Sequence, residues 1–240
     1  RHVVASYGGK LWKVAVDGSG QAEIPFTVDA RVPVGPVVRF DYRIPDSTRF
    51  VVRQLRDAVP SPDGRRLAFV ALDRVYVMDW PGGTPRRLTT LDAVEAQPAW
   101  SPDGRTLAFV TWETDAGRLL AASADGRGGV RELSPERALW QTPAWSPDGR
   151  RVVAVRGPAR AFDDAEGPNA PGSAAELVWV AAAGGRATTI ADAAGRTRPH
   201  FVVRDTGRIY LSSAQAGLTS IRWDGTDERR VLRVTGPMVP

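Results

Sequence analysis

Short apolar runs separated by turn residues make up most of this chain. Runs such as residues 66–71 and 106–111 hold five to seven mostly apolar residues, and Gly, Pro and Asp flank them. This length and these flanks are typical of buried β-strands, and no segment sustains a helical period over three turns. One stretch shows the order clearly, with strands predicted at 66–71, 75–80 and 85–89 and a Pro81-Gly82-Gly83 turn before the last. The pattern predicts an all-β protein.

A repeated phrase organises these strands. PAWSPDGRTLAFV at 98–110 returns as PAWSPDGRRVVAV at 143–155, and PSPDGRRLAFV occupies 60–70. The Ser-Pro-Asp-Gly quartets begin at Ser61, Ser101 and Ser146, so the period is 40 and then 45 residues. In the copy that starts at Gln97, strands are expected at 97–101, 106–111, 119–123 and 130–133. Four short strands per 40–50 residues are typical of one blade of a β-propeller.

The repeat predicts a single domain over 1–240 with about five four-stranded antiparallel blades. They are expected at 1–29, 58–90, 95–134, 140–191 and 198–234, with inserts at 30–57 and 161–175. The first blade has no inner strand. Either the C-terminal residues supply that strand or the chain is a window from a larger propeller, and we favour the window. Blade faces around 10–17 and 218–224 are then expected to be incompletely covered, which favours self-association.

The two inserts have different compositions. Apolar runs on either side of Pro45-Asp46-Ser47 predict an extra hairpin in the first insert. The second insert is rich in Pro, Gly, Ala and acidic residues, which is typical of a solvated loop. A lid over a ligand site and a plain surface insertion both fit this loop, and we favour the surface insertion.

Five tryptophans recur at fixed places in the repeat. Trp100 and Trp145 share one position, while Trp80, Trp179 and Trp223 end predicted third strands. A stripe at constant repeat phase indicates packing between blades, rather than a platform that stacks bases or sugars.

The net charge of +5 and the isoelectric point near 10.2 invite a nucleic-acid interpretation. However, only Lys10 and Lys13 are lysines, and the arginines are spread over every blade. Nucleic-acid binding needs a basic patch or stripe, so we do not expect it. The absence of cysteine excludes disulfides and leaves the compartment open. No apolar run is long enough to span a membrane.

Catalytic and metal-binding patterns are absent from the sequence. The two histidines, His2 and His200, are far apart, and no Gly-x-Ser-x-Gly motif occurs. Asp63, Asp103 and Asp148 recur with the turns, where their carboxylates are expected to cap the turn. Calcium is the alternative there, but one Asp per turn supplies too few oxygen ligands. We therefore assign no catalytic, cofactor-binding or metal-binding residue.

Ligand binding is expected where the first strands of the blades line a central channel. The residues just before the repeated Trp position should face that channel or its mouth. These candidate residues are Glu95, Gln97, Trp140, Gln141, Arg198 and His200.

The Ser-Pro-Asp-Gly-Arg-x-Leu-Ala-Phe pattern, followed by Val-Tyr-Val-Met-Asp and Gly-Gly-x-x-Arg-Arg-Leu-Thr, resembles the repeat of TolB-like propellers. Across nearly the whole chain, segments such as RHVVASYGGKLWKV and RPHFVVRDTGRIYLSS resemble the N-terminal propeller arrays of large bacterial amidohydrolases of the imidazolonepropionase-like type. That resemblance implies a separate metal-dependent hydrolase domain, with zinc or a similar metal held there and none here. It also favours a periplasmic or extracellular location.

Two functions of different kinds follow. The first is a non-catalytic module that binds a linked or docked hydrolase domain, or another protein. The second is a propeller that takes part in substrate selection by a hydrolase or peptidase, with a stand-alone periplasmic binding protein of the TolB type as a further alternative. The substrate and the partner are not predicted by these residues.

Overall fold

The computed structural model describes residues 1–32, 35, 48–113, 116–158, 175–202 and 205–233. The chain forms two compact units, Arg1–Phe50 and Val51–Pro240. Within the described residues all regular secondary structure is β-strand, arranged in five antiparallel sheets. The predicted all-β fold with five blade-like sheets is confirmed.

The first unit holds one three-stranded sheet in the order β1-β2-β3. Its strands are β1 (His2–Tyr7), β2 (Lys10–Ala15) and β3 (Gln21–Ile24). Within the described residues this sheet has three strands, as predicted, whereas the other sheets have four. β1 is exposed along its whole length.

The second unit contains four sheets, and each holds four consecutive strands paired in chain order. The first sheet is β4 (Arg56–Pro60), β5 (Arg66–Ala71), β6 (Arg74–Asp79) and β7 (Arg86–Arg87). The second is β8 (Val94–Trp100), β9 (Thr106–Trp112), β10 (Leu119–Ser123) and β11 (Val130–Glu132). The third is β12 (Leu139–Trp145), β13 (Arg151–Gly157), β14 (Glu176–Ala181) and β15 (Thr188–Asp192). The fourth is β16 (Thr197–Val202), β17 (Asp205–Ser213), β18 (Gly217–Arg222) and β19 (Arg229–Leu232).

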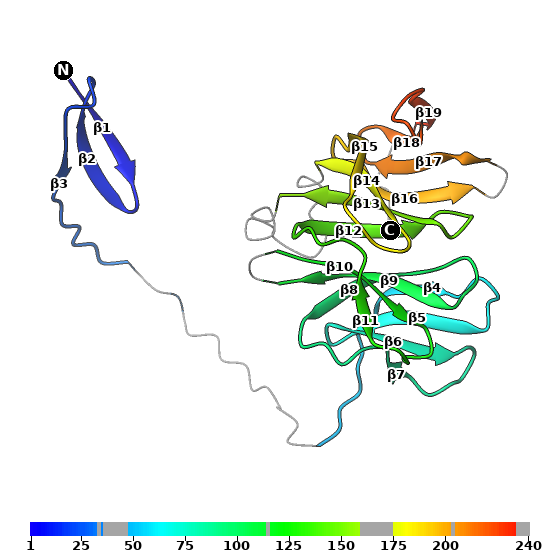
Figure 1. The fold of residues 1–240 in the computed structure, drawn as a ribbon. Coiled ribbons are helices and arrows are strands. Elements are labelled where there is room, and N and C mark those ends of the chain that lie inside the picture. Colours follow the sequence, from blue (N-terminus) through cyan, green and yellow to red (C-terminus); the bar gives the residue numbers. More distant parts are fainter. Residues whose placement is uncertain (33–34, 36–47, 114–115, 159–174, 203–204, 234–240) are drawn as a thin grey trace. The chain divides into compact units, whose positions relative to one another are not determined.

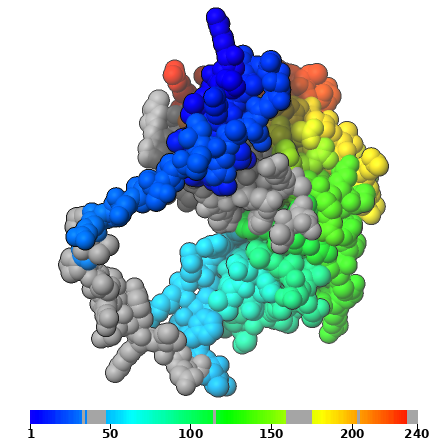
Figure 2. Space-filling model, turned by 90° about the vertical axis from the view of Figure 1, so that its left-hand side faces the viewer, coloured from blue at the N-terminus to red at the C-terminus, as the bar shows by residue number. Residues whose placement is uncertain are grey.

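These four sheets follow one another in sequence order, with the first strands of consecutive sheets in contact (Figure 1). The same order is visible on the surface, where cyan, green, yellow and orange residues succeed one another (Figure 2). β5 and β10 match their predicted bounds, whereas the first strand of the second sheet starts at Val94, earlier than the predicted 97. The first strand of the preceding sheet starts at Arg56, inside the expected insert.

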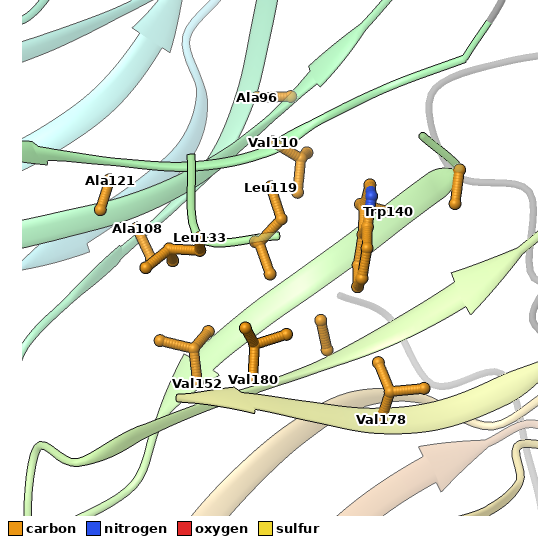
Figure 3. Close-up of a cluster of buried hydrophobic side chains, with 12 residues drawn as sticks. Ala96, Ala108, Val110, Leu119, Ala121, Leu133, Trp140, Val152, Val178 and Val180 are labelled. Carbon is orange, nitrogen blue, oxygen red and sulfur yellow. The ribbon is translucent and has the colours of Figure 1, made fainter. Parts of the chain in front are cut away.

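Strand alternation explains how the sheets stack. In β9, Leu107 and Phe109 point into the cluster shared with the first sheet, while Ala108 and Val110 point into the cluster shared with the third. Because successive side chains of a strand point to opposite faces, a strand that is buried on both faces reads as a continuous apolar run. β13 divides its valines and alanine between two clusters in the same way. Figure 3 shows the middle cluster, with Trp140 among aliphatic side chains.

The tryptophans divide into packed and exposed residues. Trp100 and Trp145 are half-buried against the clusters between sheets, as the repeat predicts. Trp179 and Trp223 pack against the last cluster. The prediction is wrong for Trp80, which is 52% exposed and belongs to none of the three clusters.

Half of the first predicted insert and nearly all of the second lie outside the described residues. Pro45-Asp46-Ser47 and the apolar run before it lie outside the described residues, as do residues 161–174 of the expected loop. The run after the expected turn is described, and its residues 50–55 form no strand, so the prediction of a second hairpin arm there is wrong.

Candidate binding cavity

The first strand of every sheet in the second unit is interrupted at the same repeat position. Asp57, Gln97, Thr142 and Arg198 have positive φ angles of 49°, 53°, 47° and 56°. The pairing of each first strand with the second strand shifts register at this point. Such bulges leave a residue unpaired by the ladder of its own sheet, so its main-chain groups can bond elsewhere.

The four bulge residues are linked by hydrogen bonds from sheet to sheet. The Gln97 amide donates to the Asp57 carboxylate at 3.1 Å, and the Thr142 amide donates to the Gln97 side-chain oxygen at 2.6 Å. The Arg198 amide donates to the Thr142 hydroxyl at 3.2 Å. In each link a side-chain oxygen of one sheet accepts a hydrogen bond from a main-chain N–H of the next sheet. We call this series the inner ladder.

A cavity of about 560 Å³ lies beside the inner ladder. It has the size of small-ligand sites in proteins. Its walls combine charged, amide and apolar groups. The lining residues are Leu55, Arg56, Asp57, Val70, Asp73, Val94, Glu95, Ala96, Gln97, Trp112 and Arg198.

Three of the six candidate residues line this cavity: Glu95, Gln97 and Arg198. Glu95 is 0% exposed, and its carboxylate accepts hydrogen bonds from the Val75 amide at 2.7 Å and from the Thr89 hydroxyl. Both of its oxygens therefore serve the fold. Arg198 is exposed, and within the described residues its guanidinium forms no ion pair or hydrogen bond, so it is available to a ligand.

The other three candidates lie elsewhere. Trp140 is fully buried in the cluster between the second and third sheets, where its indole nitrogen donates to the Glu136 carbonyl at 3.1 Å. Gln141 is buried next to it in β12. His200 is exposed; its ring lies 5.8 Å from that of Tyr210, and its Nδ1 is 3.0 Å from the Arg198 carbonyl oxygen.

The sequence analysis missed Asp57 and Thr142. Asp57, Gln97 and Thr142 each lie four residues before the serine of a Ser-Pro-Asp-Gly quartet. Alignment of the repeats at that offset would have found them.

The repeated aspartates close their turns, as predicted. The Asp103 carboxylate accepts hydrogen bonds from the Ser101 hydroxyl at 2.6 Å and from the Arg105 amide at 3.0 Å. These donors hold the pKa of Asp103 below its ordinary value of 3.8. Asp63 and Asp148 have the equivalent donors, and their pKa values are lowered for the same reason.

The cavity suits the holding of a ligand. Asp57 and Asp73 supply acceptors, Arg56 and Arg198 supply donors, and Trp112 supplies an aromatic wall. None of the residues known to line it is a Ser, Cys, Lys or His. Over the described ranges, the structure shows no group of three or more His, Cys, Asp or Glu arranged to hold a metal ion. Nor does any helix there have the length and apolar character needed to cross a bilayer.

Comparison with known proteins identifies the repeat. Residues 57–169 match the family model of the TolB beta propeller domain. A 53-residue segment is 43% identical to the uncharacterized peptidase YuxL of Bacillus subtilis (strain 168), and it covers 20% of this chain and 8% of that protein. The chain therefore matches only a small part of this curated relative.

Solved structures support the fold at low sequence identity. A structure assigned as TolB from Agrobacterium tumefaciens has a TM-score of 0.59 and 20% identity over 75% of this chain and 62% of that one. Oligogalacturonate lyase from Vibrio parahaemolyticus has a TM-score of 0.56 and 15% identity over 75% of this chain and 53% of that one. This chain has a TolB-like β-propeller fold.

Proposed function

We propose that this chain is a non-catalytic binding module, a TolB-like propeller that serves a hydrolase by holding a partner protein or a substrate. The observation that carries the proposal is the cavity beside the inner ladder, where donors and acceptors converge on an open space of about 560 Å³. The ladder bonds the main-chain amides of Gln97 and Arg198, so the main chain of this part of the lining is positioned before a ligand arrives.

Association with a hydrolase rests on two similarities. One is the 43% identity of a segment to a protein named as a peptidase. The other is the resemblance of the motifs to the propeller arrays of bacterial amidohydrolases. We therefore propose a metal-dependent amidohydrolase as the partner domain, linked or docked, with its metal held by that domain.

A direct role in substrate selection is the second candidate. It is favoured by Arg56 and Arg198, whose exposed side chains line the same cavity. Arginines without ion pairs are suited to orient the carbonyl or carboxylate of a substrate. The further alternative is that this chain is a stand-alone binding protein of the TolB type, in which the same cavity holds the ligand without a hydrolase.

The test compares kinetic parameters in the protein encoded by the complete reading frame that contains this chain. Amide hydrolysis is measured for the wild type, for Arg198→Ala and for Arg127→Ala, an exposed arginine that is not among the lining residues of the cavity. Selection by the cavity predicts that Arg198→Ala raises KM about tenfold with kcat nearly unchanged, since one interaction of about 1.4 kcal/mol is lost. Arg127→Ala should match the wild type.

Three results decide between the roles. A KM effect confined to Arg198→Ala supports substrate selection. If Arg198→Ala leaves KM and kcat unchanged but weakens the binding of the hydrolase domain to this chain, the result supports the binding module. A loss of kcat at unchanged KM would contradict both roles, because the cavity would then contribute to the chemical step.

A further inference from the structure

Arg66 lies at the interface between the first and second sheets of the second unit. Its guanidinium lies 4.8 Å from the ring of Trp100 and donates a hydrogen bond to the Gly104 carbonyl oxygen at 2.5 Å. Gly104 belongs to the Ser-Pro-Asp-Gly turn of the second sheet. At this interface, an arginine stacked on a tryptophan is therefore satisfied by an uncharged main-chain carbonyl in a turn.

Arg151 occupies the equivalent position in the third sheet, because both arginines lie five residues after the serine of a quartet. Its guanidinium lies close to two indole rings, 4.7 Å from Trp179 and 4.9 Å from Trp223. Trp223 in turn stacks on Phe201 at 5.5 Å. All N–H donors of the guanidinium lie along its edge, in the plane of the group.

The fourth repeat does not carry the motif that supplies this acceptor to Arg66. The Ser-Pro-Asp-Gly quartet is lost there, and β16 and β17 already pair at Val202 and Asp205. A hollow of about 370 Å³ lies beside Arg151, lined by Ser146, Pro147, Asp148, Arg151, Thr206 and Trp223. Across the residues that the structure places, the Arg151 guanidinium has no hydrogen bond or ion pair.

The Asp148 carboxylate offsets the charge of the Arg151 guanidinium, so the hollow does not favour an anion. Asp148 lines it, and hydrogen bonds from the Ser146 hydroxyl and the Arg150 amide lower the pKa of Asp148. Its carboxylate is therefore ionised at neutral pH and repels a second carboxylate. An uncharged acceptor avoids this repulsion and is the group that Arg66 binds.

We propose that the hollow beside Arg151 binds a turn of a partner polypeptide, whose main-chain carbonyl accepts a hydrogen bond from the Arg151 guanidinium. The turn of the partner would contact Arg151 as the Ser-Pro-Asp-Gly turn of the second sheet contacts Arg66. Trp223 forms the apolar wall, and Thr206 contributes a hydroxyl at the rim. This site is separate from the cavity beside the inner ladder, since the two share no lining residue.

The test is an NMR titration of the whole chain with a cyclic peptide that presents a Ser-Pro-Asp-Gly turn, and in parallel with acetate. The proposal predicts saturable shifts of the Arg151 Nε–H and Trp223 indole N–H signals with the peptide, and weaker effects with acetate. Arg151→Thr, which copies the residue at position 106, should bind the peptide about tenfold more weakly or worse. The matched control Arg66→Thr should bind normally, because Arg66 is already occupied by Gly104.

Each other outcome contradicts the proposal. No saturable shift, or equal binding by Arg151→Thr, would mean that the stack serves only to join the sheets. Tighter binding of acetate than of the peptide would mean that the hollow takes an anion. Shifts of the same signals with protein concentration alone would assign the hollow to a second copy of this chain. If Arg151→Thr does not fold, Arg151→Lys replaces it, because Lys keeps the charge but lacks the planar fork.

Discussion

The indole nitrogen of Trp145 donates a hydrogen bond of 3.1 Å to the carbonyl oxygen of Ala99, in the first strand of the preceding sheet. Trp100 makes the equivalent bond to Val59, one repeat earlier, at 3.0 Å. The repeated Trp thus joins sheets by a directed bond as well as by apolar contact. In the fourth sheet the position is occupied by Phe201, which has no donor to offer.

Replacement of Trp145 by Phe tests that bond. Trp145→Phe should lower the free energy of unfolding by about 1 kcal/mol, because the Ala99 carbonyl loses its donor while most of the ring contact remains. Urea denaturation followed by circular dichroism measures the change. Trp80→Phe is the control, since Trp80 is 52% exposed and should change stability by less than about 0.5 kcal/mol. Equal changes in the free energy of unfolding for Trp145→Phe and Trp80→Phe would show that the hydrogen bond to Ala99 does not stabilise the fold.

Replacement of Gln97 tests the inner ladder. Gln97→Leu leaves the Thr142 amide without its acceptor at a largely buried position, and should cost about 1–3 kcal/mol of stability. Asp57→Asn keeps an oxygen that can accept from the Gln97 amide, so its effect should be much smaller. The same denaturation measurement compares them. A Leu variant as stable as the wild type would show that the ladder contributes nothing.

The turn aspartates predict a dependence of stability on pH. The pKa of Asp103 is lowered from 3.8, mainly by the Ser101 hydroxyl and then by the Arg105 amide. A lowered folded pKa means that the carboxylate stabilises the fold fully above the unfolded value and loses that contribution as the pH falls through the folded value. The stability gap between the wild type and Asp103→Asn should therefore narrow below pH 3.8. A gap that stays constant from neutral pH to pH 3 contradicts this role of Asp103.

The isolated chain should not hydrolyse amide or ester substrates, with or without added zinc. The expectation rests on the sequence, in which the two histidines are far apart and no nucleophile motif occurs. Chromogenic amide and ester substrates measure the activity. Zinc-stimulated turnover that disappears in His200→Ala would overturn it.

The chain should self-associate as its concentration rises. Val3 and Val4 are 56% and 60% exposed, and as neighbours in β1 they lie on opposite faces of the three-stranded sheet. In the last strand, Val231 and Leu232 are exposed as well. Light scattering and thermal melts at several concentrations test this, with Val4→Thr expected to weaken association. A monomer with one concentration-independent transition would refute it.

The repeat predicted the sheets well because turn chemistry and apolar runs are local signals. β5 and β10 have their predicted bounds for this reason. The position of the site was harder to predict, because it depends on bulges at Gln97, Thr142 and Arg198. Gln, Thr and Arg are not residue types that favour positive φ, so among the four bulge residues only Asp57 carries a local signal. The bulge between Gln141 and Ala144 also shifts the register of β12, so strict alternation could not be carried through the strand that places Trp140 in the core.

The inner ladder bears on how such a chain can evolve. Every link uses a main-chain N–H as donor, so only the acceptor depends on the side chain of the repeat. A duplicated repeat that carries Asp, Gln or Thr at this position can join the series without any change in its neighbours. Arginine has no acceptor, so the Arg198 side chain cannot continue the series. Gene duplication can therefore lengthen the inner ladder from within, up to the repeat that contains Arg198.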